Sequence, residues 1–163
     1  MLEIFYSTVA YLCFGLLGLW WVVVQFKHHE WMRDPGHRRM AYDLSLYFLL
    51  PGIMSLVSLL AVDVKILWRV GFSLAAILGA IETAYVLFST RSEHTGTPLT
   101  RLGHILVFVL YVLIALVAID PTLVTNAGLG LKPIEVEGIL IVLLLFLGVN
   151  MVWAFFAQPV RED

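Results

Sequence analysis

The sequence predicts an all-α integral membrane protein, folded as a compact bundle of five transmembrane helices. Of the 163 residues, 61% are hydrophobic and only 13% are charged, and the mean hydropathy is +0.93. A soluble domain is nearer half apolar and a quarter charged, and a core this small could not hide the excess apolar surface. The apolar residues also form long continuous stretches, which suit helices whose backbone hydrogen bonds are all internal.

Five stretches reach the roughly 20 mainly apolar residues that a membrane helix needs. They are residues 6–26, 44–62, 67–89, 102–119 and 138–157. Only residues 63–66 separate the second and third stretches, so we expect a tight antiparallel hairpin there. An alternative with four spans and one re-entrant segment is open, and we prefer five. Residues 1–163 then form a single transmembrane domain.

The positive charges predict the orientation. Seven of the ten Lys and Arg residues fall on the side reached after the first span, and three fall on the other. The positive-inside rule therefore places the N-terminus outside and the C-terminus in the cytoplasm. The first span is not a cleavable signal peptide, because no basic residue precedes it and its apolar run is too long. Four basic residues of the first cytoplasmic loop should contact anionic lipid headgroups: Lys27, Arg33, Arg38 and Arg39.

Glu82 lies in the middle of the third predicted span. A charge at membrane depth costs at least about 3 kcal/mol on insertion scales, so such a residue usually faces the protein interior or a wet cavity. Ala75, Gly79 and Thr83 recur at four-residue spacing beside it, a pattern that lets neighbouring helices approach closely. Tyr85, three residues further on, is a candidate hydrogen-bond partner.

Other spans should supply polar groups at the same depth. Glu82 lies roughly 12 Å and Asn150 roughly 10 Å from the inner ends of their helices, at 1.5 Å per residue. Pro51 removes a backbone donor and frees a carbonyl group near Tyr47. The predicted polar layer consists of Glu82, Asn150, Ser55, Tyr85, Thr83 and Pro51.

Two interpretations of this layer are open. In the functional one it handles protons or cations, and Glu82 lines their route, because intramembrane ionisable groups are functional by default. In the structural one Glu82 is protonated and bonds Asn150 or a carbonyl group. Such a bond fixes helix register and contributes about 0.6 kcal/mol on average.

The histidines form a second constellation on the predicted cytoplasmic side: His28, His29, His37, His94 and His104. Imidazole is the commonest metal ligand, and nearby acidic residues could complete a shell. The spacing is poor, however, since the His29-Glu30 pair lacks the second histidine of the zinc motif. Haem held between helices needs two histidines within spans, and only His104 comes close. We therefore expect no cofactor, with a metal ion or haem as the alternative.

Several other classes are excluded or unsupported. A net charge of −2 shows no nucleic-acid footprint, and the single Cys13 allows no internal disulfide. Residues 128–130 superficially suggest a phosphate loop but lack its third glycine and a preceding strand. No serine lies in a Gly-x-Ser-x-Gly elbow, so nothing positively supports an enzyme.

Three functions remain. The first is a small channel or transporter for protons, cations or a small solute, acting as a homo-oligomer with Glu82 in the pathway. The second is a non-catalytic subunit or assembly factor of a larger membrane complex. The third is an inner-face metal or haem redox protein. The expected location is a cell membrane, and the absence of a targeting extension favours a prokaryotic cytoplasmic membrane.

Overall fold

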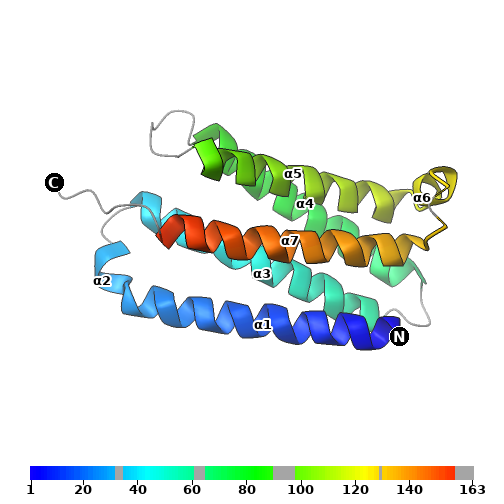
Figure 1. Ribbon diagram of the computed structural model, residues 1–163, viewed down its shortest axis with the longest axis horizontal. Helices are drawn as coiled ribbons and strands as arrows, with labels where there is room; N and C mark the ends of the chain where they lie inside the picture. Colours follow the sequence, from blue (N-terminus) through cyan, green and yellow to red (C-terminus); the bar gives the residue numbers. More distant parts are fainter. Residues whose placement is uncertain (32–34, 61–64, 90–97, 129, 157–163) are drawn as a thin grey trace.

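The computed structural model describes residues 1–31, 35–60, 65–89, 98–128 and 130–156 (Figure 1). Within these ranges all regular structure is helical, which confirms the all-α part of the predicted fold class. The five long helices are α1 (Leu2–Phe26), α3 (Pro35–Leu60), α4 (Lys65–Ser89), α5 (Pro98–Ile119) and α7 (Pro133–Phe156). Two short helices, α2 (His28–Trp31) and α6 (Thr122–Asn126), lie in the connections. Each long helix is long and apolar enough to cross a membrane.

All five long helices begin earlier than predicted, α3 and α7 by the most. α3 starts at Pro35 rather than at residue 44, and α7 starts at Pro133 rather than at residue 138. A proline suits the first helical position, because its missing N–H would have no partner there. The apolar runs mark only the hydrocarbon core, whereas a membrane helix continues through the headgroup layers on either side. Asp43 and Glu137, both assigned to loops from the sequence, therefore lie inside helices.

The long helices run alternately in opposite directions, so the N-terminus and the end of α7 lie at opposite ends of the bundle (Figure 1). α3 is the central helix and contacts α1, α4 and α7. α5 packs against α4 and α7. α3 and α4 form the antiparallel pair that the sequence predicts, and the residues that connect them lie outside the described ranges. We call the end that holds α6 and the start of α7 the α6 end, and the other the α2 end.

A glycine lies at the contact of every pair of long helices that touch in the described residues. A Cβ atom added at Gly79 of α4 would lie 2.5 Å from the ring of Tyr111 on α5. One added at Gly52 of α3 would lie 3.1 Å from the Cβ atom of Cys13 on α1. These glycines let the helix axes approach closely. The full set is Gly52, Gly71, Gly79, Gly103, Gly138 and Gly148.

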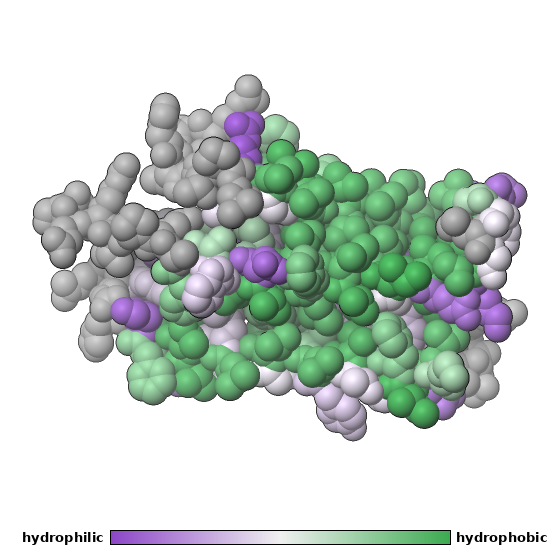
Figure 2. Space-filling model, viewed as in Figure 1, coloured by the Kyte–Doolittle hydropathy of each residue, from purple (hydrophilic) through white to green (hydrophobic). Residues whose placement is uncertain are grey.

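The outside of the bundle is as apolar as its core. Figure 2 shows hydrophobic side chains across the middle of the visible face, with hydrophilic ones mostly toward the two ends. Large hydrophobic side chains are exposed along the outer helices, among them Leu19 and Trp21 of α1 and Phe146 of α7. Such a surface suits lipid rather than water as the surrounding solvent. The five long apolar helices and this surface fit a membrane protein.

Candidate functional site

Five polar side chains gather in the core between α3, α4 and α5, in the half of the bundle nearer the α2 end. They are Asp43 and Tyr47 of α3, Thr83 of α4, and His104 and Tyr111 of α5. Each is at most 4% exposed. We call these five residues the buried polar cluster. It is the candidate functional site because buried polar groups in a membrane protein are costly.

Helix periodicity explains why these side chains lie on facing sides of their helices. Asp43 and Tyr47 are four residues apart, so they lie on one face of α3, and His104 and Tyr111 are two turns apart on α5. Gly79 leaves room on α4 for the Tyr111 ring. One turn along from Gly79, the Thr83 hydroxyl donates a hydrogen bond to the Gly79 carbonyl oxygen at 2.7 Å. The close α4–α5 contact therefore brings Tyr111 into the cluster.

The contacts of His104 define where its protons lie. Its Nδ1 atom is 2.7 Å from the carbonyl oxygen of Thr100. A carbonyl oxygen only accepts, so Nδ1 carries a proton. Its Nε2 atom lies 3.5 Å from Oδ2 of Asp43. A bare Nε2 lone pair facing a carboxylate would be repulsive, so a further proton, a water molecule or a cation is needed between the two groups.

Most polar side-chain atoms of the cluster, including those with which Asp43 and His104 face each other, lack a hydrogen-bond partner in the described part of the chain. Both Asp43 carboxylate oxygens, His104 Nε2 and the hydroxyls of Tyr47 and Tyr111 have no hydrogen-bond partner among the described residues. Asp43 is nevertheless close enough to both tyrosine hydroxyls to interact with them electrostatically. Leaving a buried polar group unpaired costs about 1–3 kcal/mol. The chemistry of these groups suits protons, water molecules or a small cation as the further partner.

Glu82, the central residue of the predicted layer, lies at the edge of the bundle. Its carboxylate accepts a hydrogen bond from Arg39 Nη2 of α3 at 3.1 Å. The Arg39 guanidinium group also lies 4.1 Å from the centre of the Tyr85 ring. The two charged side chains are 47% and 36% exposed. Arg39 precedes Asp43 by one helical turn, so this ion pair lies next to the cluster on its α2-end side.

The structure does not assemble the remaining predicted layer. Asn150 is exposed on α7, and its side-chain amide donates to the Phe146 carbonyl oxygen at 2.7 Å. In the described parts of the chain α4 and α7 are not in contact, so Asn150 does not share a site with Glu82. Ser55 is buried, but its hydroxyl donates to the carbonyl oxygen of Pro51 within α3. Of the six predicted residues, only Thr83 enters the cluster.

The three histidines whose side chains are described lie on three different helices. His104 lies in the cluster, His37 lies 5.8 Å from the Phe155 ring, and His28 is on α2. The side chain of His29 and the whole of His94 fall outside the described residues. Across the part of the chain that is described, no three His, Cys, Asp or Glu side chains lie close enough to hold a metal ion.

The basic residues predicted at the headgroups lie at the α2 end. Arg38 and Arg39 are exposed in the first turns of α3, and Lys27 follows the last residue of α1. Arg33 lies outside the described ranges. Arg39 is therefore an ion-pair partner as well as a candidate headgroup contact.

Four buried polar residues escaped the sequence analysis: Asp43, Tyr47, Tyr111 and Glu137. A signal for two of them was present, because Arg39, Asp43 and Tyr47 recur at four-residue spacing and so form one stripe of a helix. Glu137 is fully buried in α7 near the α6 end, and both of its carboxylate oxygens lack a partner within the described ranges.

Comparison with known proteins does not add to this picture, since no family model, curated protein or solved structure matches the chain.

Proposed function

We propose that this protein is a proton-conducting or proton-coupled membrane transporter whose central site is the buried polar cluster. The observation behind the proposal is the Asp43–His104 pair, which places two titratable groups 3.5 Å apart inside an apolar bundle. Intramembrane acid–histidine pairs are suited to proton relays, because either group can release and regain a shared proton.

The neighbours of the pair suggest a route. Arg39 and Glu82 lie at the α2 end within reach of solvent, and Asp43 follows Arg39 by one turn on α3. Beyond Asp43, the hydroxyls of Tyr47 and Tyr111 extend the polar groups further into the bundle. Glu82 thus belongs to the mouth of the proposed route rather than to its centre. The charge asymmetry assigns this mouth to the cytoplasmic side of a cell membrane, with the prokaryotic cytoplasmic membrane as the proposed location.

Proton flux in proteoliposomes tests the proposal. Purified protein would be reconstituted with a pH-sensitive dye inside the vesicles, and a potassium diffusion potential would drive protons inward. We expect Asp43→Asn and His104→Gln each to lower the flux by about 100-fold, the lower end of what positioned proton-transfer groups contribute. Asp120→Asn, an acid-to-amide change at an exposed position after α5, is the matched control and should leave the flux unchanged.

Three results would contradict the proposal. Wild-type vesicles could take up protons no faster than empty ones. The Asp43→Asn and His104→Gln variants could conduct like wild type. The Asp120→Asn control could lose as much flux as they do, which would show that the effect does not depend on the cluster.

A second candidate function rests on Asn150. This polar side chain is exposed on the outer face of α7, roughly 9 Å from the end of that helix at 1.5 Å per residue. A polar group facing lipid favours association with another membrane helix, from a second copy or another subunit. We expect Asn150→Leu to weaken that association, as measured by cross-linking in native membranes, while the flux through the cluster persists.

A further inference from the structure

Glu137 is a second buried acid, far from the buried polar cluster. It is the fifth residue of α7, close to the α6 end, and its side chain is fully buried. Neither carboxylate oxygen has a hydrogen-bond partner in the described ranges. The nearest polar group with a defined contact is the Tyr6 hydroxyl, which donates to the Ile134 carbonyl oxygen at 2.6 Å and not to Glu137.

Three charged side chains at the α6 end, those of Arg69, Glu135 and Asp120, have other partners. Arg69 of α4 donates to the carbonyl oxygens of Ala118 and Ile119 at the end of α5. The Glu135 carboxylate accepts from the backbone N–H of Lys132, and that of Asp120 accepts from Thr122. An ionised Glu137 would therefore be an uncompensated charge in an apolar setting, a state that proteins avoid by protonating the group.

The interior between the two acidic sites is mainly apolar. Glu137 and Asp43 lie roughly 20 Å apart along the bundle axis, as judged from their positions in antiparallel helices that rise 1.5 Å per residue. The intervening apolar side chains are at most 1% exposed and come from four helices: Met54, Phe72, Ile114, Ile141 and Leu144. The buried Ser55 hydroxyl in this layer donates to a carbonyl oxygen within α3. The two acidic sites thus lie at different depths, with a mainly apolar layer between them.

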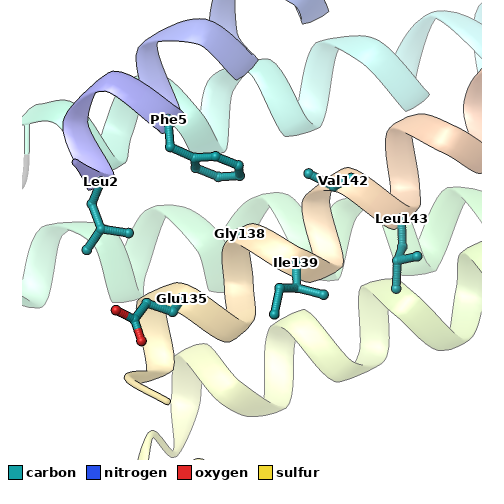
Figure 3. Close-up of a pocket in the computed structure, with 7 residues that line it drawn as sticks. All are labelled: Leu2, Phe5, Glu135, Gly138, Ile139, Val142 and Leu143. Atoms are coloured by element: carbon teal, nitrogen blue, oxygen red, sulfur yellow. The ribbon is translucent and has the colours of Figure 1, made fainter.

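The boundary between α1 and α7 at the α6 end is hollowed beside Glu137, which does not itself line the hollow. A groove of about 330 Å³ opens between the starts of these helices. Figure 3 shows Leu2 and Phe5 of α1 on one side and Gly138 of α7 on the other, with the Glu135 carboxylate at the end of the groove. Gly138 follows Glu137 directly, and the Tyr6–Ile134 hydrogen bond holds the two helices together behind it.

We infer that Glu137 is a second proton-binding site, on the opposite side of the apolar layer from the buried polar cluster, which exchanges protons when α1 and α7 separate at this groove. The inference rests on the proposed function. It extends that function by giving the protein one proton site near each end. Transfer between the sites then requires the apolar layer to open, as in a carrier rather than an open channel.

Carbodiimide labelling tests the inference without measuring flux. Dicyclohexylcarbodiimide adds to protonated carboxyl groups in apolar surroundings, and the adduct is located by peptide mass spectrometry on the full-length protein in lipid. We expect a Glu137 adduct whose rate of formation falls as the pH rises. The adduct should be absent from Glu137→Gln and retained in Asp120→Asn, which changes an exposed acid at the same end of the bundle. Tyr6→Phe, which removes the α1–α7 hydrogen bond, should speed the labelling several-fold with the acid intact.

The outcomes separate the two proposals. No Glu137 adduct, or one formed at a rate independent of pH and of Tyr6→Phe, overturns the inference whatever the flux assay shows. A pH-dependent adduct in a protein that conducts no protons supports the site and overturns only the proposed function. If Glu137→Gln fails to fold, the pH dependence of Glu137 labelling still tests the inference, because it is measured on the wild-type protein.

Discussion

α3 takes part in two acid–base pairs, which differ in their surroundings and in their basic group. Arg39 pairs with Glu82 at 3.1 Å with both side chains partly exposed, whereas Asp43, one turn later, faces His104 at 3.5 Å with both side chains almost fully buried. The exposed pair is solvated and keeps fixed charges, since arginine does not titrate. The buried pair consists of two titratable groups. Burial and the imidazole group, rather than distance alone, make the second pair suited to the proposed proton chemistry.

The largest effect should come from removing one member of the buried pair. His104→Ala leaves Asp43 without a partner in the core, and breaking a buried pair in this way costs about 3–5 kcal/mol. We expect a loss of this size in the free energy of unfolding, measured by denaturant titration in mixed micelles. Adding Asp43→Asn should restore part of it, since the unpaired charge is then gone. A double variant as unstable as the sum of the single ones would contradict the coupling.

A smaller effect is expected where the cluster meets the helix packing. Gly79→Ala would place a Cβ atom 2.5 Å from the Tyr111 ring, which must then move. Overpacking of this kind typically costs about 1–3 kcal/mol. Gly15→Ala is the matched control, because an added Cβ atom at Gly15 meets nothing within 4 Å. The midpoint temperature of thermal unfolding should fall for Gly79→Ala and stay unchanged for Gly15→Ala. Equal shifts in both variants would assign the effect to helix propensity instead.

The exposed pair should contribute least to stability among these contacts. Partly solvated ion pairs are worth about 0–1 kcal/mol after screening. A double-mutant cycle with Arg39→Gln and Glu82→Gln, measured by the same denaturant titration, should therefore give a coupling energy within that range. A coupling energy as large as that of the Asp43–His104 pair would contradict the view that solvent screens the Arg39–Glu82 pair.

Much of the fold follows from the sequence, but most of the candidate site does not. The number of long helices is correctly predicted because the length of an apolar run is a local property. The sequence did not predict that Arg39 is the partner of Glu82. Hydropathy does not reveal how α3 and α4 are rotated about their axes, and this rotation brings the two side chains together. Asp43 was assigned to a loop because it lies outside the apolar run, although α3 begins eight residues before it. Sites built between helices depend on such rotations and extensions.

The smallest effect concerns a group outside the spans. Hydrogen bonds from the side chain and backbone of Thr122 hold the pKa of Asp120 below its ordinary value of 3.8. A depressed pKa stabilises the folded turn above that ordinary value, and this stabilisation is lost as the pH falls through the lower folded value. We expect amide exchange in α6 to quicken over that acidic range in wild type but not in Asp120→Asn. The same pH dependence in both would assign it to another group.

Cys13 is the single thiol of the chain, and its side chain is fully enclosed against Gly52 at the α1–α3 contact. Any departure of α1 from its neighbours would uncover this sulfur. The wild-type protein therefore carries a built-in reporter: the rate at which a maleimide alkylates it measures how often the first helix lifts away, with no engineered label to disturb the bundle.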